Sequence, residues 1–260
     1  MIRVADYIIN KLYDEGAKHI FMVSGRGALF LTDAVAGHKS ITSIATHHEQ
    51  AAAFAAVSYS QYLEKVGVCL VSTGCASTNA LTGALNAWQD GIPCVFISGQ
   101  NKLHETSNYT EIPIRTFGQQ EANIIPIVKS ITKYATMIKD PKSIVYELEK
   151  ALYLAKNGRK GPVWLDIPLD IQNMRIEPEN LEHFSPKTIQ SDEPKPKDIK
   201  YIVDLFNTSQ RPAILIGSGV KSAEAIEDLQ DFMKESRIPL TYSASAVDTY
   251  GLKNNLSIGS

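Results

Sequence analysis

The sequence has few cysteines, no long apolar run and no excess of charge of one sign. Its three cysteines, Cys69, Cys75 and Cys94, include no Cys-x-x-Cys pair, so we expect neither a disulfide framework nor a cysteine-based metal site. No apolar segment approaches the ~20 residues of a membrane-spanning helix. The first residues, with an early acidic side chain, are not typical of a signal or transit peptide. We therefore expect a soluble, cytoplasmic protein without membrane contact.

Basic and acidic residues nearly balance. The sequence contains 26 lysines and arginines and 28 aspartates and glutamates, without long runs of like charge. Nucleic-acid and membrane surfaces are bound by clustered basic residues, so we expect small ligands instead. With 260 residues, 44% of them hydrophobic, the chain suffices for one large domain, or for one domain and part of another.

Strand and helix patterns alternate along the first two thirds of the chain. Val4, Ile8 and Leu12, followed by Gly16, predict a helix over 3–15. The predicted strands span 19–23, 41–45, 66–72, 93–98, 131–138 and 162–167, and the further helices span 49–63, 77–88 and 142–156. Uniformly apolar strands are typical of strands buried on both faces. The predicted fold class is α/β, an open parallel sheet with helices on both faces.

The remaining sequence predicts a linker and part of a second domain. Residues 174–197 contain four prolines among polar residues, which favours a linker between a first domain, 1–173, and a second that begins at 198. The second part predicts helix 198–207, strand 212–216, helix 223–235 and strand 238–242. These elements are too few for a closed core. We expect 198–260 to be an incomplete α/β domain and the chain to be a fragment.

Two strand-to-helix junctions carry candidate site residues. Glu49 follows His47 and His48 at the start of the helix 49–63, where an acid meets the positive helix end and the mouth of the sheet. Taken alone, the residue fits better an acid that only stabilises its helix. Residues 72–79, Ser-Thr-Gly-Cys-Ala-Ser-Thr-Asn, leave backbone groups open to a flat ligand. They could also be an ordinary turn with an N-cap at Ser77 or Thr78.

Two glycine motifs carry weaker signals. Gly25-Arg26-Gly27 and Gly217-Ser218-Gly219 each follow a predicted strand. A lone Gly-x-Gly without a third glycine, and without the acidic residue that binds ribose, is a weak dinucleotide signal. The Gly-x-x-x-x-Gly-Lys phosphate loop is also missing.

Taken in order, the motifs resemble one family. They are G-x-x-H-I-F-x-V-x-G at 16–25, HEQAAAFAA at 48–56, KVGVCLVSTG at 65–74, W-x-D-x-I-P at 88–93, I-S-G-Q at 97–100, Q-E-A at 120–122, S-I-T-K-Y at 130–134, GRKGPVWLDIPLDIQ at 158–172 and RPAILIGSG at 211–219. This order and spacing resemble acetolactate synthase and its thiamine-diphosphate relatives over the whole first domain. The last motif resembles the start of that family's central domain.

The resemblance implies that 1–173 is a pyrimidine-binding domain in which Glu49 activates the cofactor aminopyrimidine. Gly25 and the turn of Ser72, Thr73, Gly74 and Cys75 would line the pyrimidine pocket, with Asn79 anchoring the turn. Gln120 would face the substrate and share the catalytic role. Arg159 lies where some members contact FAD, or it is a solvated cation.

The resemblance also implies a 2-oxoacid carboligase or decarboxylase that needs Mg²⁺. The family's Gly-Asp-Gly magnesium motif is absent here, so the ligands of the metal are expected outside this segment, and the active unit is expected to be a homodimer or homotetramer. The alternative is a non-catalytic or separately encoded subunit.

The sequence departs from the family at Ser24 to Gly27, at Gly74 to Ser77 and in the long polar loop 100–120. Loops of this length are usually functional or mobile. The departures leave the identity of the 2-oxoacid open. His104, Tyr109 and Arg115 are candidate substrate contacts, or members of a solvated loop.

Overall fold

The computed structural model describes residues 1–186, 193–251 and 254–259. The chain divides into two compact units, residues 1–187 and 188–260, which we describe separately. Residues 187–192 of the predicted linker and residues 252, 253 and 260 of the predicted second domain lie outside the described residues.

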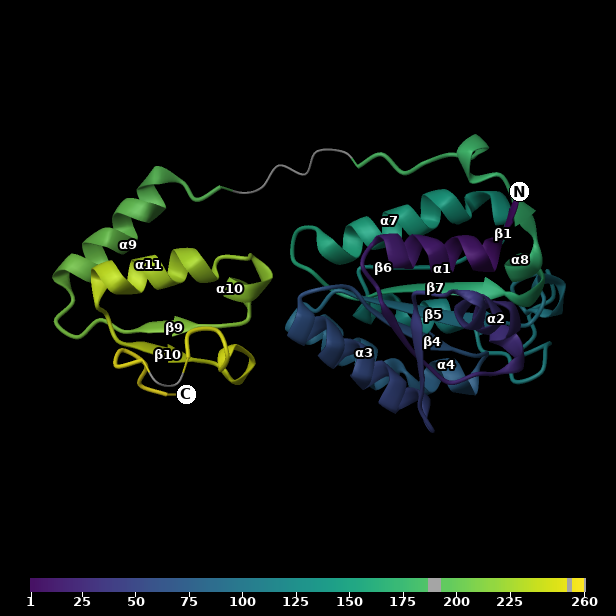
Figure 1. The fold of residues 1–260 in the computed structure, drawn as a ribbon, viewed down its shortest axis with the longest axis horizontal. Helices are drawn as coiled ribbons and strands as arrows, with labels where there is room; N and C mark the ends of the chain where they lie inside the picture. The colour runs from purple at the N-terminus through teal and green to yellow at the C-terminus, as the bar shows by residue number, and fades with distance from the viewer. Residues whose placement is uncertain (187–192, 252–253, 260) are drawn as a thin grey trace. The chain divides into compact units, whose positions relative to one another are not determined.

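A six-stranded sheet forms the centre of the first unit (Figure 1). In spatial order its strands are β3 (Thr42–Ala45), β2 (His19–Met22), β4 (Gly67–Val71), β5 (Cys94–Gln100), β7 (Val163–Pro168) and β6 (Tyr134–Met137). Every neighbouring pair is parallel. The predicted open parallel sheet is confirmed.

Helices cover both faces of this sheet, as predicted. They are α1 (Val4–Asp14), α2 (Leu29–Gly37), α3 (Glu49–Leu63), α4 (Cys75–Asn79), α5 (Leu81–Asp90), α6 (Ile124–Val128), α7 (Ile144–Lys156) and α8 (Leu169–Asn173). Successive residues of β4 alternate between two apolar clusters. Val68 and Leu70 pack with α1, α2 and α7, whereas Cys69 and Val71 pack with α3, α5 and α6. Because both faces are covered, the strand is apolar throughout.

Several helical details differ from the sequence prediction, which also lacked the short helices α6 and α8. The helix predicted over 77–88 is two helices, α4 and α5, which meet at Ala80, where the amide N–H donates to the Ser77 carbonyl in a tight i−3 turn. Helix α2 was not predicted, because its nine residues are mostly apolar and lack the one-sided pattern of a surface helix.

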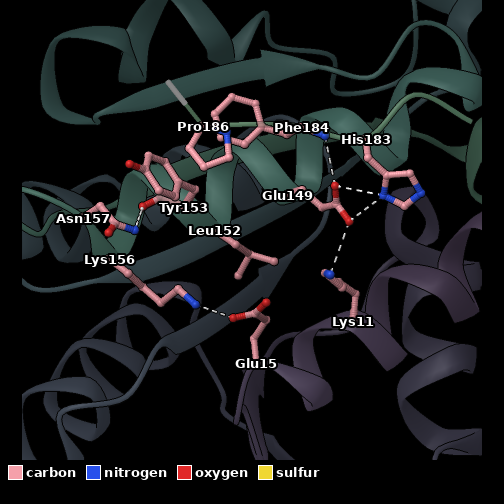
Figure 2. Close-up of a pocket in the computed structure, with 10 residues that line it drawn as sticks. All are labelled: Lys11, Glu15, Glu149, Leu152, Tyr153, Lys156, Asn157, His183, Phe184 and Pro186. Carbon is pink, nitrogen blue, oxygen red and sulfur yellow. Dashed lines mark hydrogen bonds and ion pairs between the residues drawn. The ribbon is translucent and has the colours of Figure 1, made fainter. Parts of the chain in front are cut away.

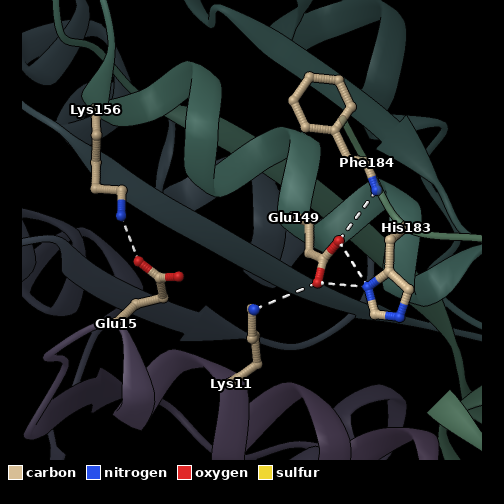
Figure 3. Close-up of polar contacts among 6 residues, drawn as sticks. All are labelled: Lys11, Glu15, Glu149, Lys156, His183 and Phe184. Carbon is tan, nitrogen blue, oxygen red and sulfur yellow. Dashed lines mark hydrogen bonds and ion pairs between the residues drawn. The ribbon is translucent and has the colours of Figure 1, made fainter. Parts of the chain in front are cut away.

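Part of the predicted linker packs on the first unit. Strand β8 (Arg175–Ile176) pairs antiparallel with β1 (Ile2–Arg3). Further along, Glu149 of α7 accepts hydrogen bonds from Lys11 Nζ at 3.3 Å, His183 Nδ1 at 3.1 Å and the Phe184 amide at 3.0 Å (Figure 3). These contacts lie in a cavity of about 370 Å³, which also holds the ion pair of Lys156 with Glu15 (Figure 2).

This attachment depends on the Glu149 carboxylate. Burial alone would raise the pKa of Glu149, but the bonds from His183, Phe184 and Lys11 lower it. A charged acceptor on α7 thus anchors a proline-containing segment through the Phe184 amide and the His183 side chain. The composition of 174–186 gave no sign of this contact, because the acceptor lies far away in the sequence.

The second unit contains a small parallel sheet of β9 (Ile214–Ile216) and β10 (Leu240–Tyr242). Its helices are α9 (Pro196–Thr208), α10 (Gly219–Ser222) and α11 (Ile226–Ser236). Its buried residues include Ile216, Met233 and Leu240. This second α/β unit agrees with the predicted fold class, although the helix predicted over 223–235 begins later, at Ile226.

No helix among the described residues of either unit is long and apolar enough to cross a membrane.

Helices α3 and α5 pack so closely that Gly83 has no room for a side chain. A Cβ there would lie 2.5 Å from the Ala53 Cβ. We expect Gly83→Ala to lower the free energy of unfolding by about 1–3 kcal/mol through overpacking. Gly37→Ala is the control, because a Cβ at Gly37 meets nothing within 4 Å. Urea denaturation that gave both variants the same stability would contradict this account of the packing.

Candidate functional site

The candidate site lies at the carboxyl ends of the central strands, where the direction of the chain connections reverses. Strand β3 follows β2 in the chain and lies on one side of it, whereas β4 lies on the other side. Such a reversal leaves a crevice that binds ligands in open α/β sheets. The predicted site residues Gly25, Glu49 and Ser72 follow β2, β3 and β4 respectively.

A cavity of about 330 Å³ occupies this crevice. It is lined by Ser24, Gly25, Arg26, Gly27, Glu49, Ser72, Thr73, Ala76, Asn101, Gln119 and Gln120. The fold therefore brings together five predicted site residues, namely Gly25, Glu49, Ser72, Thr73 and Gln120. Gly74, Cys75 and Asn79 are not among the lining residues but lie in the turn and helix immediately beside them.

Glu49 is the first residue of α3 and is half-buried. The preceding His48 caps the helix, and its Nδ1 accepts the Gln50 amide N–H at 3.1 Å. Asn79 Nδ2 donates to Glu49 Oε2 at 2.9 Å. The second carboxylate oxygen, Oε1, has no hydrogen-bond partner among the described residues. Glu49 thus lines the cavity at the N-terminal end of α3.

The turn after β4 packs directly against the turn after β2. The Gly27 amide donates to Ser72 Oγ at 3.1 Å. A Cβ on Gly25 would lie 2.5 Å from Ser72 Oγ, so only glycine fits there. Gly74 has φ +63°, and a Cβ on it would lie 1.5 Å from the Gln120 carbonyl oxygen. The turns after β2 and β4 therefore meet through backbone and small side chains.

The Thr73 hydroxyl is buried without a hydrogen-bond partner among the described residues. Thr73 lines the cavity and is only 8% exposed. A Cβ on Gly27 would lie 1.7 Å from this oxygen, so the hydroxyl packs against the backbone of Gly27 and holds the turns after β2 and β4 close together.

Sequence reasoning missed Asn101 and Gln119. Asn101 is buried and follows β5, so a polar residue just after an apolar strand was the available signal. Gln119 accepts from Arg26 Nη1 at 3.2 Å across the cavity mouth.

The other candidates lie away from the cavity lining. His104, Tyr109 and Arg115 do not line it, and Tyr109 is exposed. Arg159 donates to the Gln89 carbonyl at 3.4 Å. Cys69 and Cys94 are buried, and burial raises the pKa of both thiols, that of Cys94 to about 12. Cys75 is exposed.

Comparison with known proteins gives one consistent result. Residues 2–127 match the family described as "Thiamine pyrophosphate enzyme, N-terminal TPP binding domain". The chain is 32% identical over 253 residues to the acetolactate synthase large subunit of Haemophilus influenzae, covering 95% of this chain and 42% of the relative. It is 29% identical over 260 residues to a chloroplastic acetolactate synthase of Arabidopsis thaliana, covering 98% and 37%. The chain spans about two fifths of the length of these curated relatives.

Proposed function

We propose that this chain, which belongs to the thiamine pyrophosphate enzymes through its N-terminal domain, is the aminopyrimidine-binding part of a 2-oxoacid carboligase or decarboxylase of the acetolactate synthase type. The observation that carries the proposal is the Glu49 carboxylate. It lines the cavity at a helix N-terminus, with one oxygen held by Asn79 and the other open.

The residues of the cavity fit the aminopyrimidine of thiamine diphosphate. A planar ring suits the part of the wall that consists of glycine backbone and small side chains, which Gly25, Gly27 and Ser72 form here. Glu49 lines the same cavity and supplies the carboxylate for a hydrogen bond to a polar ring atom.

When bound, thiamine diphosphate supplies a carbon nucleophile that adds to the 2-oxo group of the substrate. The part of Glu49 is to hold a proton at its open oxygen, Oε1, in a hydrogen bond to a ring nitrogen of the aminopyrimidine. Asn79 orients that carboxylate by binding Oε2, and Oε1 has no hydrogen-bond partner among the described residues. Gln120 also lines the cavity, and its part in this proposal is to contact the substrate.

The diphosphate and Mg²⁺ are bound outside residues 1–260 in this proposal. The sequence contains no Gly-Asp-Gly, and in the described part of the chain no group of three or more His, Cys, Asp or Glu side chains could hold a metal ion. The rest of the site is then supplied by another part of the enzyme in a homodimer or homotetramer.

Calorimetry and a turnover assay test this proposal together. The complete enzyme should consume pyruvate or another 2-oxoacid with thiamine diphosphate and Mg²⁺. Residues 1–260 alone should bind thiamine diphosphate at least about ten-fold more weakly, because the charge-assisted bonds to the diphosphate are missing. Equal, Mg²⁺-dependent binding by residues 1–260 would contradict the divided site. Cofactor binding without turnover of any 2-oxoacid would favour a non-catalytic subunit.

A further inference from the structure

A chain of buried polar side chains runs beneath the wall of the cavity that carries Gln120. Ser98, Gln100 and Asn101 lie on or just after β5, and Asp166 lies on the neighbouring strand β7. All four are buried, and Asp166 is 0% exposed. A buried carboxylate in a sheet is unfavourable unless hydrogen bonds compensate for the loss of water. The hydrogen-bond partners of Asp166 therefore indicate its structural role.

The hydrogen-bond donors and acceptors of this chain have one consistent arrangement. Trp164 Nε1 donates to Ser98 Oγ at 2.9 Å, so the Ser98 hydroxyl is left to donate to Asp166 Oδ1 at 2.6 Å. Gln100 Nε2 donates to Asp166 Oδ2 at 3.2 Å. The other end of the Gln100 amide, Oε1, accepts the Asn101 backbone N–H at 3.0 Å. Asp166 therefore fixes which way the Gln100 amide points.

The other contacts of Gln100 and Asn101 reach the segment 119–122. Gln100 Nε2 also donates to the Ala122 carbonyl at 3.1 Å, and Asn101 Nδ2 donates to the Gln119 carbonyl at 3.0 Å. Between these two anchors, Gln120 has φ +54°, a left-handed conformation that is unfavourable for a residue other than glycine. The anchors on both sides hold Gln120 in that conformation.

We propose that Asp166 and Gln100 are positioning residues, which hold the segment 119–122 so that Gln120 faces the cavity. The catalytic consequence of this positioning rests on the function proposed above, whereas the positioning itself does not. Asp166 orients the Gln100 amide, and Gln100 binds the Ala122 carbonyl of the segment. Neither residue lines the cavity.

The hydrogen bonds around position 166 favour the ionised form of Asp166, and burial opposes it. Both of its oxygens face donors, Ser98 Oγ and Gln100 Nε2. An asparagine of the same size would place its NH₂ group against one of these donors. Burial raises the pKa of Asp166 to about 7, with Ser98 and Gln100 opposing the shift and Glu121 adding to it. The site thus retains an acid despite the cost of burying it.

Amide hydrogen exchange on residues 1–260 tests the positioning without cofactor or substrate. Gln100→Met keeps the length of the side chain but removes its hydrogen bonds, and should raise exchange of the amides of residues 117–121 about ten-fold or more through local opening. Gln172→Met is the matched control. Gln172 is equally buried, and its Nε2 donates to the carbonyls of Gly27 and Ile167 instead. Equal exchange of residues 117–121 in the two variants would overturn the proposal.

Asp166→Asn is a second variant for the case in which Gln100→Met does not fold. It should also raise exchange at residues 117–121, because Gln100 Nε2 loses its acceptor or the amide reverses. Unchanged exchange in this variant would overturn the role of Asp166.

Turnover by the complete enzyme tests the catalytic consequence. Gln100→Met should lower kcat about ten-fold or more, because Gln120 is misplaced. The Kd for thiamine diphosphate should stay within about three-fold of wild type, because Glu49 and Thr73 are not changed. Faster exchange with unchanged kcat would refute the link to catalysis and leave the positioning standing. A wild-type enzyme that turns over no 2-oxoacid would refute the proposed function, and the exchange result would be unaffected.

Discussion

Replacing Glu49 with glutamine in the complete enzyme should lower turnover by a factor of order 10² or more and leave the fold intact. The amide oxygen of a glutamine can still accept the Asn79 hydrogen bond, which in the wild type measures 2.9 Å. It cannot hold a proton between itself and a ring nitrogen as a carboxylate does. Only the proton-transfer role is lost, so kcat should fall at saturating cofactor.

Glu179→Gln is the control for this variant. Glu179 is exposed and lies outside the cavity lining, so the same change of charge there should leave turnover near the wild-type value. Circular dichroism and the melting temperature establish that both variants fold. Near-normal turnover by Glu49→Gln would exclude Glu49 as the activating carboxylate.

The second prediction concerns the pH dependence of stability that Asp166 creates. Its pKa is raised from 3.8 to about 7 in the folded chain, chiefly by burial. The folded state therefore holds this proton more tightly than the unfolded state does. The stability that the group contributes is fully present below its unfolded pKa and is lost as the pH rises toward the folded value.

Asp166→Asn has no titrating group at this position, so its stability should not show the loss with rising pH that Asp166 causes in the wild type. The free energy of unfolding of the wild type, minus that of Asp166→Asn, should fall by about 2–3 kcal/mol between pH 5 and pH 8. Groups common to both proteins cancel in the difference. Urea denaturation of residues 1–260 at several pH values, followed by tryptophan fluorescence, measures it. A difference that stayed constant over this range would show that Asp166 is not protonated in the folded chain near neutral pH.

In the first unit, hydrophobic periodicity predicted the main strands but missed some helices and long-range contacts. Runs such as 66–72 and 93–98 predicted strands buried on both faces, and β4 and β5 lie there with helices on each side. Helix α2 was not predicted, because its nearly uniform apolar composition carries no helical period. The packing of residues 175–184 on the first unit was also missed, since it depends on Glu149, which is remote in the sequence.

The cavity residues show a similar division. Glu49, Gly25, Ser72 and Thr73 could be proposed from ordered motifs at strand ends, and all four line one cavity. Asn101 had only the signal of a polar residue just after an apolar strand, which was not used. Gln119 could not be proposed, because it lies in a polar loop whose path over the sheet is not encoded in any local pattern.

The sequence by itself determined the alternation of strands and helices, the glycines at tight turns and the acid at the start of α3, because each depends on local periodicity or local backbone conformation. Only the tertiary structure decided which side chains share a hydrogen bond. Asn79 binds Glu49 across 30 positions, and Ser98 binds Asp166 across 68. Such pairs arise from the order of strands in the sheet, which places β5 beside β7 and the turn after β4 beside α3. Hydrogen bonding acts over a few ångströms of space, and distance along the chain does not reveal it.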